Sequence, residues 1–372
     1  MPAQPQSVRP EVRVVATAAD PLPLRSGVAL APVALEVQTW GRPNADRSNA
    51  VLVCHSFSTD AHAAGIDDTA SAQYRPWRIG QPGWWDALIG PGKAIDTDRW
   101  WVVCSGVLGG SVGSTGPLAI EPATGRPWGA RFPAIHVSDM VAAQRRLMDA
   151  LGIPRWRLVV GGSLGGAQAL AWSLDGGERV ARVFAIAASA SLAPGGRRHF
   201  QRWSQHVSAD LACGNSGLSG LHRAVSGAAL FSGGPVSQFP ANAAILTQTW
   251  PAARLHPVAY LTQARAMLDF DIARDWGDGS VEAAARRIRA EVLLAGFHGD
   301  AVFSATSQGR LSVCLNRAGV RARAIVLPSQ DGHDTFLTQP QVIAPALRAA
   351  VESDDWIALP RPALRGRPIR RS

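Results

Sequence analysis

The chain reads Val159-Val160-Gly161-Gly162-Ser163-Leu164-Gly165-Gly166 near its middle. An apolar run precedes it and helix-forming residues 167–174 follow it, so the sequence predicts a strand, a sharp turn and a helix. Small residues flank the serine in a G-x-S-x-G pattern, which lets the side chain project from the strand end. Free N–H groups at the helix start favour a developing negative charge. We therefore predict a nucleophilic Ser163; the alternative is an incidental serine in a glycine-rich turn.

Other short apolar runs on both sides of this turn indicate further strands. They are continuous rather than alternating, which is typical of parallel strands covered on both faces. The runs lie at 50–54, 100–104, 157–160, 183–187 and 291–295. Helical patterns lie between them, at 138–151, where Ser138 can cap the helix, and at 281–288. This alternation predicts an α/β fold with a doubly wound, mostly parallel sheet.

The segment 192–278 breaks that alternation, because it is rich in Gly, Ser, Ala and Pro with scattered tryptophans. We interpret it as a helical lid inserted over the active site. The predicted organisation is a first part of the core at 1–191, the lid at 192–278, a second part of the core at 279–358, and a basic, disordered tail at 359–372.

Charge and cysteine usage argue against several functions. The net charge is +9, but five arginines fall within the last twelve residues and the others are scattered among acids. A nucleic-acid interface needs a basic stripe, so we do not expect one. No apolar run reaches the roughly 18 residues of a membrane span, and we expect a cytoplasmic protein. The four cysteines are far apart, which predicts no metal site, and Cys54 and Cys104 end apolar runs as buried thiols.

A serine nucleophile needs a base, and the base needs an orienting acid. In the α/β-hydrolase fold these residues follow in the order serine, acid, histidine. Asp300 comes just after the apolar run 292–294, and His333 comes after the run 325–327. His298 is the alternative base, but it precedes Asp300 and so has the wrong order. We predict that His333 is the base, oriented by Asp300; the alternative for His333 is a surface loop histidine.

The oxyanion of an acyl-transfer intermediate needs two backbone donors. One comes from the residue after the nucleophile and one from a loop after an early strand. Leu164 follows Ser163, and Phe57 lies in the loop after the run 50–54. We predict that the N–H groups of Phe57 and Leu164 form the oxyanion hole.

With these residues in place, the chain resembles the homoserine O-acyltransferase family, which acylates homoserine for methionine biosynthesis. The resemblance rests on G-W-W at 83–85, I-G-P-G-K-A-I-D-T at 89–97, V-L-G-G at 107–110, G-S-T-G-P at 113–117, P-A-T-G at 122–125, the serine turn, and G-H-D-T-F-L at 332–337. Generic hydrolases lack the I-G-P-G-K-x-I-D-T block, so this combination is far more specific than the serine turn alone.

The resemblance implies ping-pong chemistry, in which Ser163 takes an acyl group from acyl-CoA and passes it to the hydroxyl of an amino acid. It implies that Arg223 binds the carboxylate of that amino acid and that Asp334 binds its ammonium group. It also implies a homodimer, with no bound cofactor. Family members that prefer succinyl-CoA have an arginine two residues after the triad aspartate. This chain has Val302 there, which predicts acetyl-CoA as the co-substrate.

Three alternatives to this function stay open. L-homoserine is the predicted acceptor, but the match is poor at 192–276 and residues 58–64 resemble serine-acylating relatives, so L-serine or an alcohol of a specialised pathway is the alternative acceptor. An esterase would use the same triad with water as the acceptor. A non-catalytic binding protein of this fold is the alternative from another class, although an intact triad in the right order argues against it.

Overall fold

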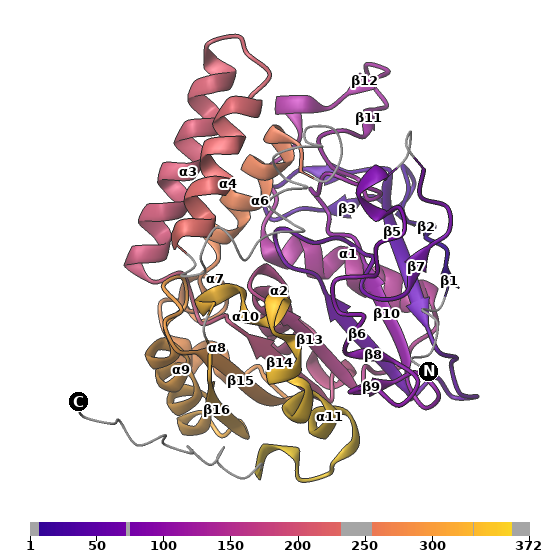
Figure 1. The fold of residues 1–372 in the computed structure, drawn as a ribbon, viewed down its shortest axis with the longest axis vertical. Helices are drawn as coiled ribbons and strands as arrows, with labels where there is room; N and C mark the ends of the chain where they lie inside the picture. Colours follow the sequence, from indigo (N-terminus) through magenta and orange to yellow (C-terminus); the bar gives the residue numbers. More distant parts are fainter. Residues whose placement is uncertain (1–6, 72–74, 232–254, 330, 359–372) are drawn as a thin grey trace, which may run out of the picture.

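The computed structural model describes residues 7–71, 75–231, 255–329 and 331–358, which form one central sheet with helices around it (Figure 1). The eight strands lie in the order β16 (Ala322–Leu327), β15 (Glu291–Phe297), β14 (Arg182–Ile186), β13 (Leu158–Gly162), β6 (Ala50–Cys54), β10 (Trp101–Ser105), β5 (Val33–Trp40) and β2 (Glu11–Ala16). The six from β16 to β10 are parallel, and β5 and β2 add an antiparallel edge. The predicted α/β fold with a mostly parallel sheet is confirmed.

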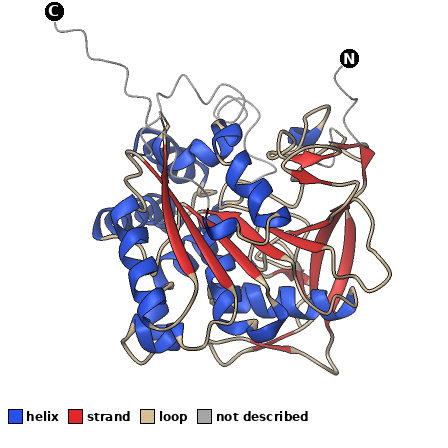
Figure 2. Ribbon diagram, turned by 90° about the horizontal axis from the view of Figure 1, so that it is seen from below, coloured by secondary structure: helices blue, strands red, loops and turns tan. Residues whose placement is uncertain are grey.

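The central strands are buried because helices or loops cover both faces of the sheet, and Figure 2 shows the strands running between the helices. Alternate residues of β6 pack into two separate apolar clusters, Leu52 into one and Val53 into the other. The first cluster includes residues of α1 (Val137–Ala150), α2 (Leu164–Asp175) and α9 (Ala305–Arg317). The second includes residues of α11 (Ala344–Glu352) and of the loop around Trp85. Burial on both faces explains the continuous apolar runs in the sequence.

The start of α1 differs from the sequence prediction. The helix begins at Val137 with His136 as its N-cap, so Ser138 lies inside the first turn and is not the cap. The side chain of Asp139 accepts the N–H of His136 at 2.9 Å and the N–H of Arg25 at 2.8 Å. The Asp139 carboxylate therefore provides the acceptor for the N-cap N–H, and Ser138 is not needed as a cap.

Among the described residues, five helices lie between β14 and β15. They are α3 (Pro194–Ala212), α4 (Leu218–Phe231), α6 (Pro257–Asp269), α7 (Ile272–Trp276) and α8 (Val281–Ala285). Helices α3, α4 and α6 stand together beside the sheet in Figure 1 and occupy the segment predicted as a lid. The start of α3 meets the loop after β15, because a Cβ built on Gly196 would lie 2.9 Å from the carbonyl oxygen of Val302.

Two sequence predictions concern the ends of the chain and its relation to membranes. The predicted tail at 359–372 lies outside the described residues. Within the described residues, none of the helices combines the length and the apolar character needed to cross a membrane.

Candidate active site

Ser163 stands at the sharp turn between β13 and α2. Its backbone has φ 57° and ψ −118°, a conformation that non-glycine residues rarely adopt. The turn packs directly against the end of β6: a Cβ added to Gly161 or to Gly165 would lie 2.5 or 2.1 Å from the carbonyl oxygen of Cys54. Glycine is therefore required at both positions, and the strained serine is held at the carboxyl end of the sheet.

The structure brings Ser163, His333 and Asp300 into one hydrogen-bonded series. The Nε2 atom of His333 lies 2.8 Å from Oγ of Ser163, and its Nδ1 atom lies 3.0 Å from Oδ2 of Asp300. All three residues are buried. The other carboxylate oxygen of Asp300 accepts the N–H groups of Val302 and Phe303, each at 2.8 Å. Those two bonds fix the carboxylate so that Oδ2 faces the imidazole, which is the geometry of an activated serine nucleophile.

The electrostatic environment of His333 suits a general base. Burial alone lowers the pKa of an imidazole, because it disfavours the charged form. Here the charge of Asp300, its hydrogen bond and the charge of Asp334 outweigh burial and raise the pKa of His333 above its ordinary value of about 6.5. The imidazolium that forms when Ser163 gives up its proton is thereby stabilised.

The other predicted site residues, Asp334 and Arg223, and the alternative base His298 differ in exposure. Asp334 follows His333 directly and is half-buried. Arg223 is exposed on α4, and its charge contributes, after a hydrogen bond from Gly220, to lowering the pKa of Asp210. Within the described part of the chain, no hydrogen bond or ion pair joins Arg223 to the triad. His298, the alternative base, is exposed, whereas Asp300 two residues later is buried.

The two predicted oxyanion donors lie on neighbouring elements. Leu164 is the first residue of α2, and Phe57 is in the loop that follows β6. The Phe57 ring packs edge-on against Tyr260 of α6 and Phe200 of α3, with ring centroids 5.1 and 5.9 Å apart. The helices of the predicted lid therefore contact the oxyanion loop through aromatic side chains.

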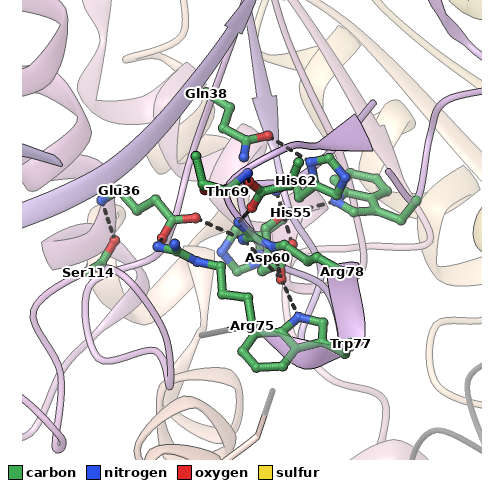
Figure 3. A network of polar contacts seen from close by, with 12 residues as sticks. Glu36, Gln38, His55, Asp60, His62, Thr69, Arg75, Trp77, Arg78 and Ser114 are labelled. Carbon is green, nitrogen blue, oxygen red and sulfur yellow. Dashed lines mark hydrogen bonds and ion pairs between the residues drawn. The ribbon is translucent and has the colours of Figure 1, made fainter. Parts of the chain in front are cut away.

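Behind this loop lies a buried network of charged side chains (Figure 3). Arg78, which is only 2% exposed, donates to Oδ2 of Asp60 at 3.1 Å, to Oδ2 of Asp67 at 3.0 Å and to Oε1 of Glu36 at 2.8 Å. Trp77 also donates to Asp60, at 3.0 Å. Because Asp60 lies three residues after Phe57 and Glu36 lies on β5, the network ties the oxyanion loop to the sheet.

Sequence reasoning did not single out this network. One signal for it exists, since Glu36 is a charge inside the otherwise mostly apolar strand Val33–Trp40 and is buried there. A buried carboxylate needs a partner, so the strand itself indicates that a cation lies beside it.

Among the described residues, no group of three His, Cys, Asp or Glu side chains is placed to hold a metal ion. Cys54 and Cys104 are buried, and burial raises the pKa of both thiols. These two residues pack as apolar groups rather than as thiolate ligands.

Comparison with known proteins places the chain among α/β-hydrolase-fold acyltransferases. The α/β-hydrolase-fold family matches residues 49–212. The homoserine O-acetyltransferase of Symbiobacterium thermophilum is 36% identical over 364 residues, covering 90% of this chain and 92% of that protein. The homoserine O-succinyltransferase of Aromatoleum aromaticum is 51% identical over 191 residues, which cover 51% of this chain and 48% of that protein.

A solved structure shows the same fold along nearly the whole chain. The crystal structure of homoserine O-acetyltransferase from Bacillus anthracis superposes with a TM-score of 0.81 at 23% identity and covers 93% of this chain and 98% of that one. Together with the 36% identity over 90% of the chain, this confirms the resemblance predicted from the motifs. The chain belongs to the homoserine O-acyltransferase family, a family of acyltransferase enzymes with the α/β-hydrolase fold.

Proposed function

We propose that this protein is a homoserine O-acetyltransferase, which moves the acetyl group of acetyl-CoA to the hydroxyl of L-homoserine. The observation that carries the proposal is the series Ser163–His333–Asp300 within a chain that is 36% identical to a homoserine O-acetyltransferase over 90% of its length. Such a series performs acyl transfer through a covalent serine ester.

In the first half-reaction, Oγ of Ser163 attacks the thioester carbonyl while Nε2 of His333 takes the serine proton. The carbonyl oxygen becomes an oxyanion, which the N–H groups of Phe57 and Leu164 stabilise. When the carbon–sulfur bond breaks, the leaving CoA sulfur takes the proton from His333. The product is acetyl-Ser163 and free CoA.

In the second half-reaction, the hydroxyl of L-homoserine gives its proton to His333 and attacks the ester carbonyl. A second oxyanion forms at the same two donors. Its collapse breaks the bond to Oγ, and His333 returns the proton to Ser163. Orientation of the acceptor is the task we assign to Arg223 for the carboxylate and to Asp334 for the ammonium group.

The loop that holds the triad aspartate supports acetyl-CoA as the acyl donor. Val302 lies two residues after Asp300 and is buried. A succinyl group carries a free carboxylate, which loses solvation in a buried pocket without a cation. An acetyl group has no such cost, so we propose acetyl-CoA as the donor. Succinyl-CoA is the competing donor to measure, because half of the chain is 51% identical to a homoserine O-succinyltransferase.

The decisive experiment measures release of free CoA thiol from acetyl-CoA, with L-homoserine, with L-serine and without an amino acid. We expect rapid release only with L-homoserine, together with a mass increase of L-homoserine by one acetyl group. Rapid release with L-serine would reassign the acceptor. A rate that does not depend on any amino acid would indicate an esterase, and no release from any acyl-CoA would indicate a binding protein.

A further inference from the structure

Three buried side chains form a directed chain of hydrogen bonds beneath the active site. The indole N–H of Trp172 donates to Oε1 of Gln144 at 2.8 Å, and Nε2 of Gln144 donates to Oε1 of Gln168 at 2.8 Å. The Nε2 group of Gln168 then donates to the carbonyl oxygens of His55 and Leu164, both at 3.3 Å. Each of these three residues is at most 2% exposed.

The direction of this chain follows from chemistry. An indole nitrogen can only donate, so the atom of Gln144 that faces Trp172 must be oxygen. Its NH₂ group therefore faces Gln168, whose own oxygen must accept. The NH₂ group of Gln168 is left to face the two backbone carbonyls, so Trp172 determines the orientation of both amides.

The two carbonyls that Gln168 contacts belong to the two sides of the oxyanion hole. Leu164 supplies one predicted donor, and His55 lies two residues before the other, Phe57. The first turn of α2 and the end of β6 meet here, because a Cβ on Gly165 would lie 3.1 Å from the carbonyl oxygen of His55. One buried amide therefore touches both arms of the site.

Two successive peptide groups connect the carbonyl of His55, which Gln168 contacts, to the N–H of Phe57. The His55–Ser56 peptide is held by Gln168 at its carbonyl and by Oγ1 of Thr59, which accepts the Ser56 N–H at 2.8 Å. The next carbonyl, of Ser56, accepts Nδ1–H of His55 at 2.8 Å, while Nε2 of His55 accepts the N–H of Val107 at 3.0 Å. Because a backbone N–H only donates, the imidazole tautomer is determined.

The planarity of the peptide completes the connection. The carbonyl of Ser56 and the N–H of Phe57 belong to one planar trans peptide, so they point in opposite directions. Fixing the direction of the carbonyl fixes the direction of the N–H. Three of the four polar groups of these two peptides have the partners given above, and the fourth is the N–H predicted to bind the oxyanion.

We propose that Gln168 is a positioning residue for the oxyanion hole, setting the separation and direction of the Phe57 and Leu164 N–H groups. This role rests on the acyl-serine chemistry proposed above. Oxyanion donors act only within about 2.7–3.1 Å of the oxygen, and a displacement of about 1 Å costs on the order of a hundredfold in rate. A side chain that touches both arms controls that distance without contacting the substrate.

The test replaces Gln168 by methionine, which keeps the length of the side chain and removes its donors. We expect the kcat for acyl-enzyme formation from acetyl-CoA to fall roughly ten- to a hundredfold, with KM nearly unchanged. An alkylboronic acid binds Ser163 as a tetrahedral anion that uses the same donors. Its inhibition constant should rise by the same factor as kcat/KM falls.

A second variant tests the chain of hydrogen bonds from Trp172 to Gln168 without altering Gln168. Gln144→Met can neither accept from Trp172 nor donate to Oε1 of Gln168, so the orientation of the Gln168 amide is no longer determined. It should show the same pattern with a smaller loss. Gln308→Met, at a buried glutamine of α9, is the matched control for loss of a buried amide and should leave both quantities at wild-type values.

Two results would overturn the proposal. One is a Gln168→Met enzyme with wild-type acylation rate and boronic-acid affinity. The other is a slower enzyme whose boronic-acid affinity is unchanged, because that pattern reports a smaller active fraction rather than a displaced donor. Failure of the proposed function is separable, since the boronic acid reports on Ser163 and its donors whether or not acetyl-CoA is the natural substrate.

Discussion

Nε2 of His333 lies 2.8 Å from Oγ of Ser163, although 170 positions separate them in the chain. Ser163 follows β13 and His333 follows β16, and β14 and β15 lie between these two strands in the sheet. Asp300, which follows β15, holds His333 from the other side. The contact therefore depends on the loops that follow β13, β15 and β16. These loops meet at the carboxyl ends of the parallel strands, where the reacting groups of this fold converge.

Ser163→Ala should abolish the covalent intermediate and lower turnover by several orders of magnitude, because only binding and the oxyanion hole remain. Intact-mass measurement after mixing with acetyl-CoA checks this. The matched control is Ser173→Ala, a buried serine further along α2, which should still gain one acetyl group. An acetyl adduct of equal yield on the Ser163→Ala protein would exclude Ser163 as the nucleophile.

Asp300→Asn should change both the rate and its dependence on pH. Activity needs neutral His333, so it rises with pH through the pKa of that residue, which Asp300 helps to raise above about 6.5. Removing the negative charge lowers this pKa, so the rising limb should move to lower pH. The plateau should fall by about 10⁴-fold, because the tautomer is no longer held. A pH–rate profile checks both, and a limb that moves to higher pH would contradict the assignment.

Val302→Arg should shift donor preference toward succinyl-CoA. A guanidinium at this position can pair with the free succinyl carboxylate, which is worth about 1.5–3 kcal/mol as a charged hydrogen bond. The ratio of kcat/KM for succinyl-CoA to that for acetyl-CoA is the measurement, with Val302→Met as the uncharged control. A native enzyme that prefers succinyl-CoA would show that Val302 does not set the donor preference.

Arg223→Ala should impair use of L-homoserine while first-step acylation by acetyl-CoA stays near the native rate. The side chain is exposed on α4, and among the described residues it has no hydrogen bond or ion pair to the triad, so its loss should leave the nucleophile intact. Rapid-mixing acylation and the KM for L-homoserine separate the two steps. Arg265→Ala, at an exposed arginine of α6, is the control. Equal loss of both steps would mean that Arg223 supports the structure or binds the donor.

Arg78→Met should lower the free energy of unfolding by about 3–5 kcal/mol, because it leaves buried carboxylates without their cation. Asp60 and Asp67 are the carboxylates left without a cation, while Glu36 keeps its ion pair with Arg75. Urea unfolding followed by fluorescence measures the change. Arg9→Met removes the exposed pair with Asp68 and should cost at most about 1 kcal/mol. Similar values for the two variants would show that the buried network is not a stabilising centre.

Much of the fold could be predicted because its strands are buried on both faces. The run 50–54 coincides with β6, and the other predicted strands differ from the observed ones by a residue or two. The serine turn could also be predicted from the sequence, because only glycine fits at 161 and 165, where the turn packs against Cys54. The order of Ser163, Asp300 and His333 then follows from the parallel topology.

What could not be predicted depends on contacts between distant segments. The start of α1 was misplaced because Asp139 also bonds Arg25, 114 positions away. Arg78 meets acids from three segments, and a loop arginine shows no local pattern that distinguishes it from a surface one. The role of Gln168 could not be predicted either, because a glutamine in a helix is ordinarily solvated. The orientation of its amide depends on Gln144 and, through it, on Trp172.

The packing of Phe57 against Phe200 and Tyr260 limits how these enzymes can exchange parts. A chimera that takes its lid helices from a relative and its sheet from this chain would set foreign side chains against Phe57. Each lost edge-to-face pair removes about 0.5–1.5 kcal/mol, and an uncovered ring loosens Phe57, whose N–H is a predicted oxyanion donor. Recombination within the family should therefore succeed mainly when residue 57 and the lid are inherited from the same parent.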